Sequence, residues 1–153
     1  MKVRCGFTLV EILIVVSILG ILAAIVIPQY SSGTTEARDA GLRSNLQIVR
    51  KQIALYKLHH HGLWPAAEGE THDDFQRRLT SRTDEWGEPG TQFGPYLERL
   101  PTNIFNKLAT VRIGGAPAGS NTHGWRFDPS TGQFQADDNH DSNADGVADH
   151  VSL

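Results

Sequence analysis

The chain has 153 residues, a formal net charge of −3 and one cysteine, Cys5. A mildly acidic chain without a basic patch argues against nucleic acid as its main partner. Its Ser, His and Asp residues have no spacing typical of a nucleophilic triad, and it has neither a phosphate-binding loop nor a zinc signature. The sequence therefore predicts no enzyme and no catalytic residue. A single cysteine also leaves no internal disulfide to stabilise the fold.

An apolar run over residues 7–27 follows a short basic head that contains Lys2 and Arg4. At about 1.5 Å per residue, the run forms roughly 31 Å of helix, which is enough to cross a bilayer core. A cleavable signal peptide would have a shorter apolar core and an A-x-A-like site before Pro28, which is absent. We therefore expect a transmembrane helix with its N-terminus in the cytoplasm.

Glu11 is the only ionisable residue in this run. A charge near the bilayer centre costs about 2.5–3.5 kcal/mol, so carboxylates inside a membrane are functional by default. The alternative is that Glu11 snorkels to the nearby interface. A cut between Gly6 and Phe7 would create an α-amino group four residues before Glu11. A neighbouring copy could then present this cation to the carboxylate.

The stretch GFTLVE, with its basic leader and apolar continuation, resembles the class III signal of type IV pilins and type II secretion pseudopilins. The resemblance implies that residues 1–6 are a leader, which a prepilin peptidase removes after Gly6. It also implies that Phe7 becomes the methylated N-terminus, and that Glu11 pairs with the N-terminus of the adjacent subunit during assembly. Gly20 and Pro28 follow at the family's spacing.

Residues 28–62 predict an amphipathic continuation of the helix. Apolar residues spaced by four and three form one stripe, namely Leu42, Leu46, Val49, Ile53 and Tyr56. Gly62 supplies a stop signal. The three histidines before it point about 100° apart on a helix and cannot converge on one metal ion. We expect them to form a solvated helix end.

Residues 63–153 predict a small exported domain. The segment 71–79 begins like a capping box and indicates a short helix, and one further helical turn is expected at 96–100. Three strands follow in ATVRIGG, GWRFD and GQFQA, the last two joined as a hairpin. Their aromatic residues should point into the core, namely Trp125, Phe127 and Phe134. The fold class is therefore α+β, a pilin-like long N-terminal helix packed against a small antiparallel sheet with a C-terminal loop.

Two further segments, GLWPAAEG and FGPYLERLPTNIFN, resemble the G-type major pseudopilins of type II secretion. This resemblance implies a subunit that polymerises with itself and with minor pseudopilins on an inner-membrane assembly platform, with its C-terminal domain in the periplasm. The resulting filament would drive the export of folded proteins. The alternative is a type IV pilin of a surface pilus. Many such pilins carry a cysteine pair, which this chain lacks.

The acidic C-terminal loop, residues 137–153, contains the pattern D-x-N-x-D-G. Oxygen atoms at alternating positions wrap a hard cation such as calcium. The expected ligands are Asp141, Asn143, Asp145, the Val147 carbonyl and Asp149, with Asp137 or Asp138 completing the shell because Ser152 replaces the usual glutamate. G-type pseudopilins resemble this arrangement. The alternative is a solvated acidic tail without a metal.

Overall fold

The computed structural model describes residues 7–141, 146 and 148–153, and within this set it leaves the side chains of residues 26–33 undescribed. The chain divides into two compact units, Met1–Asp39 and Ala40–Leu153. The proposed cleavage residue Gly6 lies outside the described residues, as do Asn143, Asp145 and Val147 of the acidic loop.

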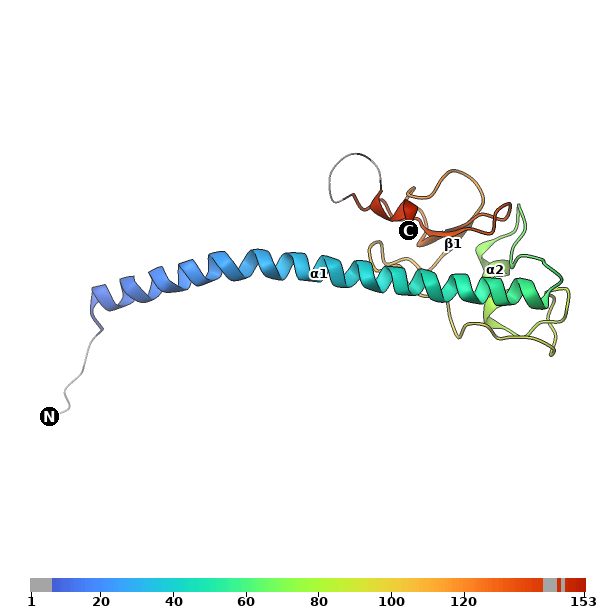
Figure 1. Cartoon of the computed structure of the whole chain (residues 1–153), viewed down its shortest axis with the longest axis horizontal. Coiled ribbons are helices and arrows are strands. Elements are labelled where there is room, and N and C mark those ends of the chain that lie inside the picture. Colours follow the sequence, from blue (N-terminus) through green and yellow to red (C-terminus); the bar gives the residue numbers. More distant parts are fainter. Residues whose placement is uncertain (1–6, 142–145, 147) are drawn as a thin grey trace. The chain divides into compact units, whose positions relative to one another are not determined.

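Helix α1, Leu9–His59, contributes its C-terminal part to the second unit (Figure 1). The predicted stripe is confirmed, because all five of its residues are at most 2% exposed. The helix ends as the sequence predicts. Residues His61 and Gly62 both have positive φ, and the Gly62 N–H donates to the Lys57 carbonyl at 2.9 Å. This hydrogen bond, which the left-handed backbone at the helix end permits, satisfies a carbonyl that has no donor within the helix.

Helix α2, His72–Thr80, begins with the predicted capping box. The Asp74 N–H donates to the Thr71 hydroxyl at 3.4 Å, and the Thr71 N–H donates to the Asp74 carboxylate at 3.0 Å. Phe75 and Leu79 are fully buried on one face of the helix. Two backbone donors are therefore satisfied at the helix start, while the apolar face enters the core.

We expect Thr71→Ala to lower the stability of the second unit by about 1 kcal/mol, because the N-cap acceptor is lost. The midpoint of thermal unfolding should fall by roughly 4 °C. Thr80→Ala is the matched control, since it removes the same hydroxyl from the other end of α2, where it donates to the Gln76 carbonyl and caps no helix start. Equal melting temperatures for the two variants would contradict this account of the cap.

The three predicted strands form one sheet in the order β1-β2-β3, with β1 at Val111–Ile113, β2 at Trp125–Phe127 and β3 at Phe134–Ala136. Strands β2 and β3 pair antiparallel as predicted. Strands β1 and β2 pair in parallel, so the expected all-antiparallel sheet is wrong and the sheet is mixed. The reason is the connection: residues 114–124 form a long loop rather than a tight turn, and parallel neighbours need such a crossover.

The predicted helical turn at 96–100 is not formed. Instead, the backbone N–H groups of Tyr96 and Leu97 both donate to the Leu79 carbonyl at 2.9 Å. Pro101 disfavours helical geometry at the residue before it. This segment is therefore held against α2 by backbone hydrogen bonds that a local sequence pattern does not reveal.

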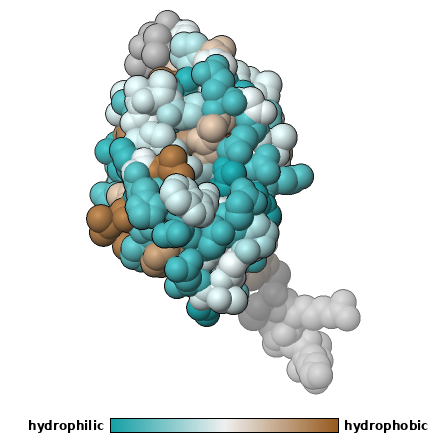
Figure 2. Space-filling view, turned by 90° about the vertical axis from the view of Figure 1, so that its right-hand side faces the viewer, coloured by the Kyte–Doolittle hydropathy of each residue, from teal (hydrophilic) through white to brown (hydrophobic). Residues whose placement is uncertain are grey.

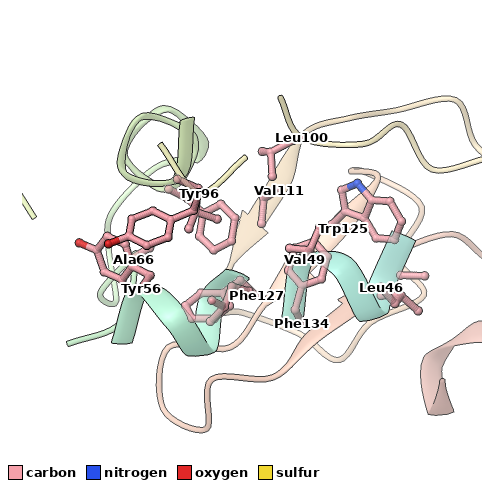
Figure 3. Packing of buried hydrophobic residues seen from close by; sticks show 14 of the residues in the cluster. Leu46, Val49, Tyr56, Ala66, Tyr96, Leu100, Val111, Trp125, Phe127 and Phe134 are labelled. Carbon is pink, nitrogen blue, oxygen red and sulfur yellow. The ribbon is translucent and has the colours of Figure 1, made fainter. Parts of the chain in front are cut away.

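The core lies between the α1 stripe and the sheet, as Figure 3 shows for Leu46 and Val49 opposite Trp125 and Phe134. The three predicted inward aromatics, Trp125, Phe127 and Phe134, are fully buried. The Trp125 indole N–H donates to a loop carbonyl at 2.8 Å, so its one polar atom is satisfied inside the core.

Candidate functional site

Glu11 lies in the first turn of α1, where Thr8 satisfies part of its hydrogen-bonding capacity. The Thr8 N–H and hydroxyl donate to Glu11 Oε2 at 2.9 and 2.8 Å, and the Glu11 N–H donates to the Thr8 hydroxyl at 3.2 Å. This is a capping box. T-x-x-E at the start of the apolar run is the signature of this capping box, which was not predicted. Glu11 therefore starts the helix as well as carrying the charge.

These contacts with Thr8 bring no cation to the Glu11 carboxylate. Thr8 supplies only neutral donors, and no ion pair of Glu11 occurs among the residues that the structure describes. Phe7, whose amine the proposed cut would release, is 80% exposed. Both members of the expected intersubunit pair are thus accessible to a second molecule.

The first unit presents apolar side chains on every side of α1. Its large hydrophobic residues from Leu9 to Ile25 are each 49–82% exposed. A helix that is hydrophobic all round requires an apolar environment all round. Within the described part of the chain, no helix meets the length and apolarity needed to cross a bilayer. The span predicted over 7–27 includes residues whose side chains lie outside that part, and it stays a prediction.

The three histidines at the end of α1 point in different directions, as predicted, but they are not a solvated helix end. His60 is fully buried, where its Nδ1–H donates to the Tyr56 carbonyl at 2.7 Å and its Nε2 lies 2.9 Å from the Thr83 hydroxyl. His59 contacts the Tyr96 hydroxyl at 3.0 Å, and only His61 is exposed. No metal-binding group of three His, Cys, Asp or Glu residues occurs among the described residues.

Asp137 is fully buried, and protein donors occupy both of its oxygens. Arg112 Nη2 donates to Oδ1 at 2.6 Å, and the Ser120 hydroxyl donates to Oδ2 at 2.9 Å. Burial alone would raise the pKa of Asp137, but the hydrogen bonds from Arg112 and Ser120 hold it below its usual value. Asp137 thus fastens the loop before β2 to the end of β3.

Asp138, like Asp137, accepts hydrogen bonds from protein donors at both of its carboxylate oxygens. Asn103 Nδ2 donates to its Oδ2 and His150 Nδ1 donates to its Oδ1, each at 2.7 Å. The His150 ring lies against Phe105, with 4.2 Å between ring centroids. This cluster was not predicted, because its members come from three separate segments of the chain. Asp138 therefore anchors the base of the acidic loop.

The acidic loop is closed at its base by the Asp149 N–H, which donates to the His140 carbonyl at 2.8 Å. Inside the loop, the Gly146 N–H donates to Asp141 Oδ2 at 2.8 Å, and Gly146 has a φ of 81°. The other carboxylate oxygen, Asp141 Oδ1, is buried and has no donor among the described residues. A buried carboxylate oxygen without a partner is costly unless a cation neutralises it.

Comparison with known proteins places this geometry in context. Residues 1–27 match the family model of the prokaryotic N-terminal methylation motif. The chain is 28% identical over 138 residues to the type II secretion system core protein G of Pseudomonas aeruginosa, a match that covers 80% of this chain and 95% of that protein. No solved structure gives a significant match.

Pilins match over a shorter length. A type IV major pilin protein PilE of Neisseria gonorrhoeae is 38% identical over 60 residues, 39% of this chain and 35% of that protein. A fimbrial protein of Pseudomonas aeruginosa is 58% identical over 50 residues, 33% of this chain and 32% of that protein. These matches therefore span about a third of each pilin. None of these names is that of an enzyme, in agreement with the prediction. The chain thus carries the prokaryotic N-terminal methylation motif and is similar to core protein G over most of its length and to type IV pilins over a shorter length.

Proposed function

We propose that the chain is the major pseudopilin of a type II secretion system, which polymerises into a periplasmic filament that drives the export of folded proteins. One observation carries this choice. The similarity to core protein G covers 80% of the chain and must therefore extend over most of the unit Ala40–Leu153, whereas the pilin matches cover 40% or less.

The alternative is a type IV pilin of a surface pilus, acting in adhesion, motility or DNA uptake. The 58% identity to a fimbrial protein over 50 residues supports it. The lack of a cysteine after Cys5 favours the pseudopilin, because many pilins fasten a C-terminal loop with a disulfide.

The N-terminal segment supplies the assembly chemistry in this proposal. A prepilin peptidase cuts after Gly6, and methylation of Phe7 leaves its new amine cationic. The apolar part of α1 anchors the subunit in the inner membrane, with the second unit in the periplasm. The Glu11 carboxylate then forms an ion pair with the Phe7 amine of an adjacent copy. Minor pseudopilins and an inner-membrane platform direct the assembly.

Deleting the gene tests the choice between the two filaments. For a pseudopilin, we expect exported enzymes to accumulate in the periplasm while surface fibres stay normal. Loss of surface fibres with undisturbed enzyme export would instead favour the pilus. Both readouts are taken from the same cultures, so that a general growth defect is not mistaken for either result.

We also propose that the acidic loop binds calcium. The unpartnered, buried Asp141 Oδ1 supports this proposal, and so does the positive φ of Gly146, which permits a sharp turn among the ligands. Asp137 and Asp138 stay outside the ligand set because protein donors already occupy them. Asp141, Asn143, Asp145, the Val147 carbonyl and Asp149 hold the ion, which cross-links a loop that no disulfide fastens.

Calcium should therefore raise the melting temperature of the second unit. At a free concentration of about 100 times Kd, binding adds about 2.7 kcal/mol, which corresponds to roughly 10 °C. Magnesium should do much less, because it demands a tighter octahedral shell. Thermal unfolding of the full chain in detergent, with and without calcium, measures this shift.

Asp145→Ala should abolish the calcium shift, since it removes a carboxylate from the loop. Asp73→Ala is the matched control, because Asp73 is an exposed aspartate on α2. It should keep the full shift. An unchanged melting curve of the natural chain at millimolar calcium would leave the loop as a solvated acidic segment.

A further inference from the structure

A cavity of about 390 Å³ lies in the second unit, beside the end of α1. Its lining includes Tyr56, Leu63, Trp64, Ala66, Arg78 and Trp86. Figure 2 looks onto the end of the unit at which α1 ends, and it shows a mainly hydrophilic surface interrupted by hydrophobic side chains. Small-molecule sites typically have volumes of about 300–1,000 Å³ and combine apolar walls with a few polar groups. The filament function uses none of these residues.

Two polar atoms beside the cavity have no partner among the residues that the structure describes. The Tyr56 side chain is buried, with its ring stacked on His60 at 3.8 Å, yet its hydroxyl makes no hydrogen bond within the described residues. Arg78 Nε is also buried without an acceptor among them. A side chain at Gly87 would collide with the Tyr56 hydroxyl and touch Arg78 Nε, so the two atoms lie close together. Arg78 Nε is itself shielded from the cavity, so the Tyr56 hydroxyl is the atom of the two that can donate to a ligand.

Two of the charged residues at the cavity, Arg78 and Glu70, already pair with each other. Arg78 donates to both carboxylate oxygens of Glu70, at 2.6 and 2.9 Å. The hydrogen bonds from Arg78 lower the pKa of Glu70, which keeps the pair ionised. The Lys57 ammonium lies 3.6 Å from the Trp64 ring centroid, so a cation already occupies one face of this indole. A neutral ligand fits this environment better than an anion or a further cation. Glu68, also on the cavity wall, offers an acceptor.

Trp86 is an exposed aromatic residue on a well-built turn. Its side chain is 61% exposed, and the backbone N–H groups of Trp86 and Glu88 both donate to Asp84 Oδ1 at 2.9 Å. The His61 ring lies 5.3 Å from the Trp86 ring and contacts Glu85 at 3.3 Å. These hydrogen bonds and the contact with His61 restrict the movement of Trp86. The indole ring therefore offers a flat apolar surface at the cavity.

We propose that this cavity binds a neutral saccharide. A sugar ring offers an apolar C–H face to the Trp86 indole, while its hydroxyl groups accept from the Tyr56 hydroxyl and donate to Glu68. A hydroxyl both donates and accepts, which suits a site that holds an unpartnered donor beside a carboxylate. The saccharide site is independent of filament assembly and of calcium.

Saturation-transfer NMR on the full chain tests the proposal, with glucose, maltose and N-acetylglucosamine as probes. The detergent must have no sugar head group, because such a head group would compete for the cavity. We expect at least one probe to receive saturation through its ring protons and to bind with a Kd in the millimolar range. No transfer to any of the three probes in large excess would overturn the proposal.

Two variants locate the binding. Trp86→Ala should weaken it about tenfold by removing the flat surface, and Tyr56→Phe about fivefold by removing one donor while keeping the core packing. Tyr96→Phe is the matched control, because it removes a buried phenol hydroxyl that bonds to His59 outside the cavity. The Tyr96→Phe variant should bind the saccharide probes with the same Kd as the natural chain. Unchanged affinity in both cavity variants, with unchanged melting temperatures, would contradict the site.

Discussion

Glu11→Gln should insert into the membrane normally but assemble filaments poorly. Insertion becomes easier because a charge is removed from an apolar helix. Assembly fails because the amine of the neighbouring Phe7 is left buried without a counter-ion. Removing one partner of such a pair costs about 3–5 kcal/mol, which lowers the association constant by more than about a hundredfold.

Glu11→Gln removes the charge at this position but keeps the hydrogen bonds that start α1. Glutamine at the same position still accepts from Thr8, because a capping box tolerates Glu or Gln. The start of α1 is therefore retained, and a loss of assembly reports on the intersubunit pair. Glu36→Gln is the matched control, since Glu36 is an exposed glutamate on the same helix. Membrane pools and sheared filaments are compared for both variants, and a normal filament yield from Glu11→Gln would mean that the carboxylate only snorkels.

Gly6→Val should block maturation completely. A branched side chain next to the proposed scissile bond crowds a protease site that takes glycine, so the leader stays attached. Without the cut, Phe7 has no free amine, and the cation that Glu11 requires never forms. Gly20→Val is the control, because Gly20 lies in the apolar helix, away from the cut, and has open space around its Cα.

Intact-mass measurement of the membrane protein decides the processing prediction. The natural chain should begin at Phe7 and carry one additional methyl group, and Gly20→Val should do the same. Gly6→Val should retain residues 1–6. A natural chain that still begins at Met1, or that begins near Tyr30, would contradict the cleavage site and with it the intersubunit pair.

Local patterns predicted the elements of the second unit well. The helical stripe that includes Leu46 and Val49 faces the core, and α2 begins at the predicted cap. These features depend on residues three or four positions apart, whose geometry on a helix is fixed. The three strands follow in the same way from their β-branched and aromatic residues.

Contacts between residues far apart in the sequence could not be predicted from these local patterns. The parallel pairing of β1 with β2 depends on the path of residues 114–124, whose Gly-, Pro- and Asn-rich sequence indicates a loop but not the direction in which the chain returns. His60 was expected in solvent, but Thr83 and Tyr56 enclose it. Asp138, named from the sequence only as a candidate calcium ligand, accepts a hydrogen bond from Asn103, 35 positions away in the sequence, and this contact was not predicted. Burial of a polar residue depends on partners that the neighbouring sequence does not contain.

The central claim, that Glu11 and a processed Phe7 assemble a secretion filament, is tested most directly by complementing the deletion strain. The measurement is the fraction of a normally exported enzyme that reaches the medium, with the remainder recovered from the periplasm. The account predicts that the natural chain and Glu36→Gln restore export, whereas Glu11→Gln and Gly6→Val leave the enzyme in the periplasm. Full export with either of the last two variants, or no loss of export in the deletion strain, would contradict it.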